Sequence, residues 1–312
     1  MTSQSRIVLR GGLVADPSLQ PELGEADLWI EGERIVSAGD APPRWEDPGS
    51  PPIESIDCSG CLLLPGNVCS HGHLYSALAT GMPAPAVAPT NFVEILERVW
   101  WKLDVALDER SLRASALAGA MSAIRSGTTA IIDHHASPSF IDGSLDVIAD
   151  ALEEVGLRSV LCYEVTDRGG LGRRDAGVAE NERFIRSSRP LARGLVGGHA
   201  SFTMGDETLD ACVDVAQRTG AGLHVHAAED GADEKDCVAK HGKRVVHRFR
   251  DAGALSLPKT LLVHGVCLDQ EEREILAASP AWIAHNARSN MNNSVGYASP
   301  SNLGPRVVLG TD

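Results

Sequence analysis

Residues 221–230, with the sequence AGLHVHAAED, carry a histidine and a carboxylate directly behind a short apolar run. His226 ends the run, and Glu229 follows three residues later, where the chain is expected to turn away from a strand. The arrangement recurs at His71 and His73 in CLLLPGNVCSHGHLYS (61–76), at His264 in TLLVHGV (260–266) and at Asp312 in RVVLGTD (306–312). Packing explains one such histidine but not several, so the pattern indicates a metal-hydrolase site built from the ends of parallel strands.

Eight short apolar runs alternate with longer helical patterns along the chain. Each run is continuous rather than alternating, as expected for a strand that is covered on both faces. Strand followed by helix, eight times, predicts an α/β fold, a TIM-like (β/α)8 barrel with its active site at the carboxyl ends of the strands. The runs lie at residues 62–64, 129–133, 159–163, 194–199, 222–226, 260–264, 281–285 and 306–310.

The first sixty residues have a different pattern. RIVLRGGLVAD (6–16), ADLWIEGE (26–33) and RIVSAGD (34–40) are short β-type runs broken by Gly and Asp, which is typical of hairpin strands. The Pro-rich stretch that follows, residues 41–52, cannot pair in a sheet. We therefore predict a small partial β-sandwich domain at residues 1–60 and the barrel at residues 61–312.

Composition excludes several classes of function. The 312 residues carry a formal charge of −14, so a basic surface for nucleic acid is not expected, and no apolar stretch is long enough to span a membrane. The seven cysteines form an odd, unpatterned set without a signal peptide, which favours a reducing, cytoplasmic location. We interpret the isolated pair Cys58 and Cys61 as chance spacing.

The predicted site has the chemistry of metal-assisted hydrolysis. His71 and His73 are two residues apart, so on an extended chain both imidazoles point to one side and reach one ion. A divalent ion held by neutral imidazoles and a carboxylate lowers the pKa of a bound water from ~15.7 toward ~7. Asp312 would take the proton, Glu229 would deliver it to the leaving group, and His264 would orient the hydroxide.

These segments resemble the amidohydrolase superfamily, in its cytosine-deaminase-like and chlorohydrolase-related branch. The resemblance rests on PGNVCSHGHLYS (65–76), HVHAAED (224–230), LLVHG (261–265), HNARSNMNN (285–293) and LGTD (309–312). Longer segments such as WWKLDVALDERSL (100–112) are most similar to the aminohydrolases called SsnA, and the likeness covers essentially the whole chain. It implies a TIM-like barrel beside a small β-sandwich and a bound divalent metal ion.

The resemblance also implies roles for individual residues. Glu229 becomes the proton shuttle, His264 a hydrogen-bonding partner of the hydroxide or substrate, and His199 a residue that faces the substrate. A capping or buried histidine is an equally good interpretation of His199. The metal ligands implied by the resemblance are His71, His73, His226 and Asp312.

The fourth apolar run bears on the number of metal ions. Two-metal members of the superfamily use a bridging residue there, often a carboxylated lysine, whereas RGLVGGH (193–199) has no Lys, Cys or Glu. We therefore predict one divalent metal ion, zinc by preference and iron as the alternative. Glu164, which ends the third run, is the strongest argument against a single metal ion.

Other residues give weaker signals. His134 and His135 would line the pocket or orient a ligand from behind it, or simply open a polar loop. Trp101 would cover one face of a flat substrate ring, or belong to the core. His285 would recognise a heterocycle or lie in a loop whose amides fix its shape, and His224 is interpreted as a packed barrel residue.

We predict a metal-dependent aminohydrolase (deaminase) that acts on a small heterocyclic substrate and releases ammonia. The alternatives are ring dechlorination or opening of a cyclic amide on the same site, and a catalytically impaired fragment. A non-catalytic binding barrel is disfavoured, because binding alone needs no shuttle carboxylate such as Glu229. Analogy with other barrels suggests a homo-oligomer. Neither nucleic acid nor a membrane is an expected partner.

The chain stops at Asp312, which is itself an expected ligand. The resemblance implies a final helix and the C-terminal half of the sandwich beyond this point, and these 312 residues contain neither. We therefore expect a truncated sequence, and we expect the 312-residue chain alone to bind metal poorly.

Overall fold

The computed structural model describes residues 5–16 and 23–312. Residues 1–4 and 17–22 of the predicted N-terminal domain lie outside this description. The chain separates into two compact units, Met1–Gly66 and Asn67–Asp312, which are described in turn.

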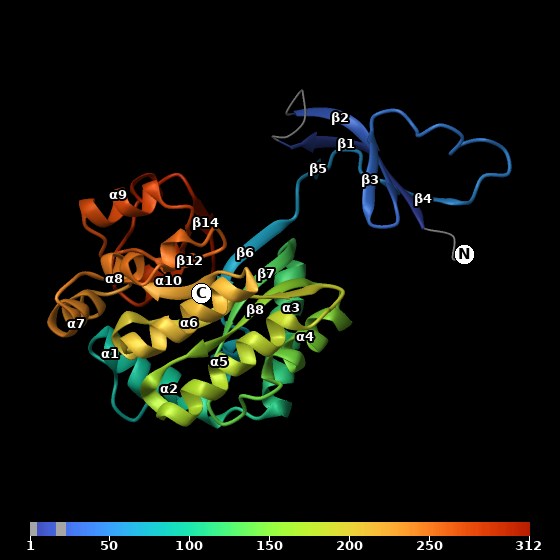
Figure 1. Ribbon diagram of the computed structural model, residues 1–312. Helices are drawn as coiled ribbons and strands as arrows, with labels where there is room; N and C mark the ends of the chain where they lie inside the picture. Colours follow the sequence, from blue (N-terminus) through green and yellow to red (C-terminus); the bar gives the residue numbers. More distant parts are fainter. Residues whose placement is uncertain (1–4, 17–22) are drawn as a thin grey trace. The chain divides into compact units, whose positions relative to one another are not determined.

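The N-terminal unit is built on a single five-stranded sheet (Figure 1). Strands β1 (Arg6–Ala15), β2 (Leu23–Glu31) and β3 (Arg34–Ala38) pair antiparallel, and β4 (Ile53–Asp57) and β5 (Leu62–Leu63) pair parallel to β1. Val8, Trp29 and Trp45 form its small core, with the two indole rings edge to face at 5.8 Å. Aromatic pairs prefer this arrangement, and it holds the Pro-rich segment against the sheet.

The second unit is a nearly closed barrel of eight parallel strands. Each strand pairs with the next in the sequence, and a short strand β9 (Ala192–Gly194) is added beside β8. At the open seam, the backbone N–H groups of Thr311 and Asp312 donate to the carbonyl of His71 at 2.9 and 3.1 Å. The predicted (β/α)8 barrel is therefore confirmed. Its strands are β6 (Asn67–Gly72), β7 (Thr128–His135), β8 (Arg158–Val165), β10 (Val196–Ala200), β11 (Leu223–Ala227), β12 (Leu261–His264), β13 (Trp282–His285) and β14 (Val307–Leu309).

Helices surround the strands on the outside of the barrel (Figure 1). Their starts follow the usual capping chemistry: Asp108 and Ser111 form a capping box at α3, and Asp269 and Glu272 form one at α9. The helices are α1 (Phe92–Ile95), α2 (Trp101–Leu103), α3 (Glu109–Arg125), α4 (Ser144–Glu154), α5 (Leu171–Arg186), α6 (Asp206–Thr219), α7 (Gly231–His241), α8 (Val245–Asp251), α9 (Gln270–Ala278) and α10 (Ala287–Asn292). Single helical turns are η1 (Leu74–Ser76), η2 (Ala79–Gly81), η3 (Leu96–Trp100), η4 (Asp104–Ala106), η5 (Asp167–Gly169), η6 (Ser201–Thr203), η7 (Ala254–Ser256) and η8 (Pro300–Asn302).

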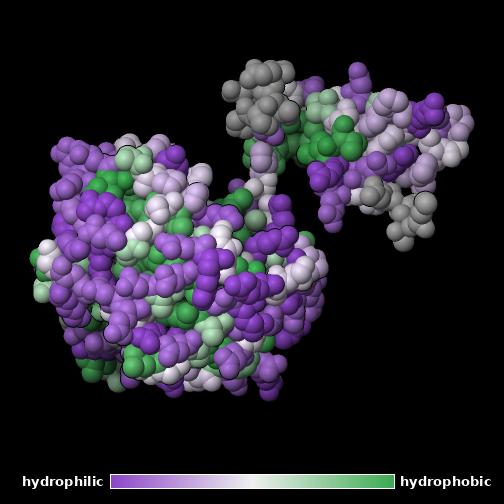
Figure 2. Space-filling model, viewed as in Figure 1, coloured by the Kyte–Doolittle hydropathy of each residue, from purple (hydrophilic) through white to green (hydrophobic). Residues whose placement is uncertain are grey.

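The barrel is held by apolar contacts between strands and helices. Leu112, Leu145 and Leu161 are fully buried where α3 and α4 cover β7 and β8. Leu223 and Phe249 are buried in a second cluster under α6 to α8. Hydrophilic residues cover most of the visible surface (Figure 2). Of the helices that the structure describes, none combines the length and apolar character needed to cross a membrane.

One predicted strand was wrong. Residues 62–64 were expected to open the barrel, but Leu62–Leu63 form β5 and pair with β1 in the N-terminal sheet. The first barrel strand is instead β6, Asn67–Gly72, whose sequence NVCSHG is not an apolar run. Its buried positions are Ser70, His71 and Gly72, none of which has an apolar side chain. His71 belongs to the site, and Ser70 lines a separate cavity.

Candidate metal centre

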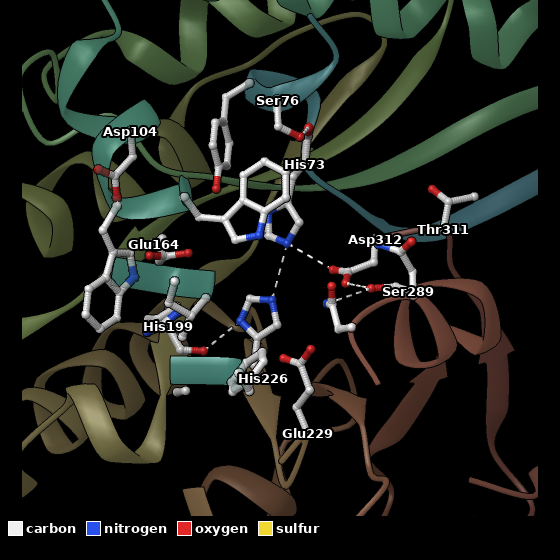
Figure 3. A pocket seen from close by; sticks show the side chains of 18 of the residues that line it. His73, Ser76, Asp104, Glu164, His199, His226, Glu229, Ser289, Thr311 and Asp312 are labelled. Atoms are coloured by element: carbon white, nitrogen blue, oxygen red, sulfur yellow. Dashed lines mark hydrogen bonds and ion pairs between the residues drawn. The ribbon is translucent and has the colours of Figure 1, made fainter. Parts of the chain in front are cut away.

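Four donor side chains from distant parts of the chain converge at the carboxyl end of the barrel, and Figure 3 shows three of them, His73, His226 and Asp312. His71, His73, His226 and Asp312 each offer one donor atom, and these atoms all lie within 4.8 Å of one another. Oδ1 of Asp312 lies 2.7 Å from Nε2 of His71 and 3.1 Å from Nε2 of His73. Nε2 of His226 lies 3.3 Å from Nε2 of His73. Donor atoms ~2.1 Å from one zinc ion lie roughly 3 to 4 Å apart, so the set suits a single ion.

The outer nitrogens of two of these imidazoles are held by backbone carbonyls. Nδ1 of His73 donates to the carbonyl of His134 at 2.7 Å, and Nδ1 of His226 donates to the carbonyl of His199 at 2.8 Å. Each bond assigns the proton to Nδ1 and leaves the lone pair of Nε2 facing the cluster. The tautomers that a metal ion requires are thus imposed by the barrel backbone.

His71 is oriented by a buried chain of side chains. Its Nδ1 lies 2.9 Å from Nε2 of His224, whose Nδ1 lies 3.4 Å from Sγ of Cys162. The thiol donates to the carbonyl of Asp133 at 3.5 Å. Burial raises the pKa of Cys162, so it stays a thiol, and every group in the chain then donates in one direction. His224 is buried as predicted, but it also fixes the proton on Nδ1 of His71.

The electrostatics of the cluster favour a positive charge at its centre. Burial lowers the pKa of His71 to about 3, although Asp312 opposes this effect. Burial also acts to lower the pKa of His73, but the hydrogen bond and charge of Asp312 raise it to about 9. Burial would raise the pKa of Asp312, yet its histidine neighbours hold it well below the ordinary value. The buried carboxylate of Asp312 therefore stabilises a positive charge beside it, which is either a proton on His73 or a bound cation.

A second group of polar side chains borders the four donors. Nε2 of His264 lies 3.3 Å from Oε2 of Glu229 and 3.8 Å from Oδ2 of Asp312. Nδ1 of His264 donates to Oδ1 of Asn290 at 2.7 Å, and Ser289 donates to Oδ2 of Asp312 at 2.5 Å. Burial raises the pKa of Glu229 to about 7; Asp312 adds to this shift and His264 opposes it. A carboxyl group with a pKa near neutrality can both accept and donate a proton.

Backbone conformation at this group is unusual. Ala228, His264 and Asp312 all have positive φ, at 52°, 77° and 65°. Residues other than glycine rarely adopt this region, and such strain is found where the surrounding fold holds a functional group in place. At Ala228 and His264 it turns the chain directly at the ends of β11 and β12.

Three of the donors, His73, His226 and Asp312, line a cavity of about 510 Å³. His199 and Trp101, which the sequence suggested as substrate-binding residues, also line it, and their rings lie 6.2 Å apart. His199 is neutral, since burial lowers its pKa to about 4, and its Nδ1 is 2.6 Å from the hydroxyl of Thr203. That hydroxyl donates to the carbonyl of Ala200, so it accepts from Nδ1 and leaves Nε2 of His199 as an acceptor.

His134 and His285 were predicted to bind substrate, but neither is among the lining residues. Nε2 of His134 donates to the carbonyl of Gly198 at 3.1 Å, and its ring packs against that of His226 at 4.6 Å. His285 is buried beside Tyr297. Apolar runs locate the end of a strand, but they do not tell which side of the strand a terminal side chain takes.

Sequence reasoning missed part of the cavity wall. Asp104, in the turn η4, lines the cavity and accepts a hydrogen bond from Arg168. It falls within the quoted segment 100–112, but neither residue was assigned a role. Tyr75 lines the cavity from the turn that follows the His71 and His73 pair. The pair WW at residues 100–101 was the available signal for this region, since aromatic residues in a polar excursion often border a cavity.

Comparison with known proteins places this site in a family. Residues 62–312 match the model of the amidohydrolase family. The chain is 30% identical to the 5-methylthioadenosine/S-adenosylhomocysteine deaminase 2 of Archaeoglobus fulgidus. This match covers 98% of the chain and 70% of that protein. The chain is 29% identical to the 5′-deoxyadenosine deaminase of Methanopyrus kandleri, over 98% of this chain and 69% of that protein.

A solved structure agrees with the fold. An atrazine chlorohydrolase of Arthrobacter aurescens complexed with zinc aligns over 98% of this chain and 71% of its own, with a TM-score of 0.82 at 23% identity. At that identity the likeness concerns the fold alone. The family match covers most of the chain, and the motif resemblance is confirmed: this chain belongs to the amidohydrolase family.

Proposed function

We propose that this protein is a metal-dependent aminohydrolase that removes an exocyclic amino group from a small heterocycle and releases ammonia. The observation that carries the proposal is the convergence of His71, His73, His226 and Asp312 beside the buried carboxyl group of Glu229. Three imidazoles and one carboxylate are zinc ligands, and a zinc ion held by them would take a water molecule as a fifth ligand, since zinc can expand to five-coordinate. Several relatives are named as deaminases of adenosine-type compounds, which supports an amino-substituted ring as substrate.

In this proposal His71, His73, His226 and Asp312 hold one divalent ion, with zinc preferred over iron. The ion would supply Lewis acidity, which lowers the pKa of a water molecule to near neutrality. The proposal of a single ion is supported by β10, because its residues 196–200 include no Lys, Cys or Glu that could bridge two ions. Glu164 lies near the cluster, but Oε1 accepts from Arg168 at 3.2 Å.

Glu229 moves the proton in this proposal. Its pKa of about 7 allows it to take a proton from the attacking water and give it to the departing amine. His264 is placed to orient both partners, because its Nε2 faces Glu229 and Asp312 while Asn290 holds its other nitrogen. Nε2 of His199 adds an acceptor on the cavity wall for a donor on the ring.

The test is turnover by the full-length protein loaded with zinc. A panel of aminopurines, aminopyrimidines, aminotriazines and their nucleosides is assayed separately for ammonia, chloride and ring opening. Ammonia release from at least one amino-substituted ring is the expected result. Chloride release or ring opening without ammonia would replace the deaminase proposal with another hydrolysis.

Glu229→Gln separates catalysis from binding. The variant should keep its zinc and lose about 10² to 10⁴ in kcat, because the amide cannot shuttle the proton. Glu180→Gln is the control, since Glu180 is an equally buried carboxylate that pairs with Arg183 away from the cavity. Full activity in Glu229→Gln would exclude the shuttle role.

A further inference from the structure

A carboxylate that the proposed chemistry does not use lies in the wall of the cavity. Glu164, at the end of β8, lines the cavity and is only 5% exposed. In the view of Figure 3, Glu164, Asp104 and His199 lie on one side of His73 and His226, whereas Asp312 and Ser289 lie on the other. Glu164 therefore borders the part of the cavity away from the ligand Asp312.

Arg168 holds this carboxylate in place. Its Nη2 donates to Oε1 of Glu164 at 3.2 Å and to Oδ2 of Asp104 at 2.8 Å. The guanidinium carbon of Arg168 lies 4.5 Å from the centre of the Trp101 ring, so the cation is stacked as well as paired. One cation thus faces two carboxylates, and this corner of the cavity retains a negative charge.

The second oxygen of Glu164 makes only one long contact. Oε2 lies 3.4 Å from Nδ1 of His134, and this nitrogen has no hydrogen-bond partner among residues 5–16 and 23–312. His134 is fully buried and does not line the cavity, whereas Glu164 does. An N–H group in the cavity would therefore give Oε2 the close donor that it lacks.

A carboxylate with a purely structural role looks different in this protein. Glu180 is 2% exposed, does not line the cavity, and has both oxygens partnered. Its Oε1 accepts from the N–H of Leu145 and from Arg183, and its Oε2 accepts from Nε of Arg183. Glu164 has one oxygen anchored and the other without such a donor.

We propose that Glu164 is a specificity-determining residue that accepts a hydrogen bond from a second exocyclic amino group of the substrate. The substrate class is then a heterocycle with a second hydrogen-bond donor besides the amino group that is lost. An oxo group at the same place would face a carboxylate and is rejected. This inference rests on the proposed function, because it assumes that the ring lies in this cavity with its reacting carbon at the four donors.

A second metal ion between His134 and Glu164 is less well supported. These two residues and His226 form a possible donor group. Nδ1 of His226, however, donates to a carbonyl, and Nε2 belongs to the four-donor cluster. A second ion would therefore have only two ligands of its own, fewer than the three protein ligands of an ordinary zinc site.

The test compares matched rings that differ at one position. Adenosine, 2-aminoadenosine and 2-oxoadenosine share the reacting 6-amino group and carry hydrogen, an amino donor or an oxo acceptor at position 2. In the second set, 4-aminopyrimidine, 2,4-diaminopyrimidine and cytosine share the reacting 4-amino group and differ in the same way at position 2. The zinc-loaded wild type should favour the amino member over the oxo member by about tenfold or more in kcat/KM. The product is identified by its retention time and ultraviolet spectrum against authentic standards, because loss of one or the other amino group gives isomers of equal mass.

Glu164→Gln should reverse the polarity of this corner. Arg168 still requires an oxygen, so the amide presents its NH₂ toward His134 and the cavity. The preference for the amino member should fall at least tenfold, and the oxo member should gain relative to it. Glu180→Gln should leave the preference within about twofold of wild type. Zinc content and melting temperature are measured for every variant, so that loss of fold or metal is not mistaken for loss of specificity.

Three results would overturn the inference: an equal response of wild type to amino and oxo members, an unchanged preference in Glu164→Gln with normal zinc and fold, or a second zinc ion that the variant loses. If the zinc-loaded wild type releases ammonia from no ring on any panel, the proposed function fails instead. The affinities of 2-aminoadenosine and 2-oxoadenosine for wild type and Glu164→Gln, measured by calorimetry, then decide the inference alone. Affinities that do not differ, or no binding at millimolar concentration, would reject it.

Discussion

Asp312 and His71 lie 241 positions apart in the chain and contact each other twice. Oδ1 of Asp312 is 2.7 Å from Nε2 of His71, and the backbone N–H of Asp312 donates to the carbonyl of His71 at 3.1 Å. The second contact helps to close the barrel between β14 and β6, and the first belongs to the candidate metal site. Closure of the barrel and assembly of the four donors are therefore one structural event.

Gly310→Ala should disturb both the closure of the barrel and the assembly of the four donors. A Cβ on Gly310 would lie 2.3 Å from Oδ1 of Asn286 and 2.9 Å from the backbone oxygen of His71, so the seam between β14 and β6 would have to open. We expect a loss of about 1 to 3 kcal/mol in the free energy of unfolding and weaker zinc binding. Denaturant titration and zinc competition measure the two effects. Gly172→Ala is the control, because nothing lies within 4 Å of its Cβ position; equal behaviour of the two variants would contradict the prediction.

His224→Leu should weaken metal binding without unfolding the barrel. The variant removes the acceptor for Nδ1–H of His71, and loss of such a partner typically costs 10- to 100-fold in metal affinity. The measurement is zinc affinity by competition with a chromogenic chelator. Cys162→Ser keeps a donor and acceptor at the end of the chain and should bind zinc nearly as the wild type does. Unchanged affinity in His224→Leu would mean that His71 needs no orienting partner.

Removal of zinc should lower thermal stability. A ligand at 100 times its Kd stabilises the folded state by about 2.7 kcal/mol, which is roughly 5 to 10 °C for a domain of this size. We expect the melting temperature to fall by this amount in a strong chelator and to recover when zinc is returned. His73→Asn should show no response to either treatment, whereas His247→Asn, outside the site, should respond as wild type. A zinc response in His73→Asn would place the stabilising ion elsewhere.

Glu234 should make stability depend on pH. Burial raises its pKa to about 8; neighbouring Glu272 adds to the shift and Arg244 opposes it. The folded state keeps this proton up to about pH 8, while the unfolded chain releases it near 4.5, so the stabilising contribution is complete below pH 4.5 and is lost as pH rises to about 8.

Glu234→Gln imitates the protonated side chain and should remove this dependence. Relative to wild type, its free energy of unfolding should rise between pH 5 and 8 by at least about 1 kcal/mol, and the two proteins should be equal below pH 4.5. Urea titrations across this range give the answer. Glu207→Gln, at a side chain that is 91% exposed, serves as the control and should track wild type. Parallel curves for Glu234→Gln and wild type would show that Glu234 is ionised in the folded protein.

Seven of the eight barrel strands could be predicted because they contain short apolar runs, most of which are buried. The first strand could not, since its buried positions, Ser70, His71 and Gly72, leave no hydrophobic pattern. The residues at 62–64 are more hydrophobic than those of β6, but Leu62 and Leu63 complete the N-terminal sheet. Periodicity reports burial, and a strand whose buried positions serve the site gives a weak signal.

The sequence by itself determined the alternation of strands and helices and the side chains that follow the strand ends, because both are local properties of composition and spacing. That is how His226, Glu229, His264 and Asp312 were found. Only the tertiary structure decided which side chains face one another. The proton direction from His71 through His224 to Cys162, and the meeting of Glu164 with Asp104 and His134, depend on the register between strands and on loops packed over them. Those distances arise from the whole fold, since no segment of the chain contains both partners of these long-range contacts.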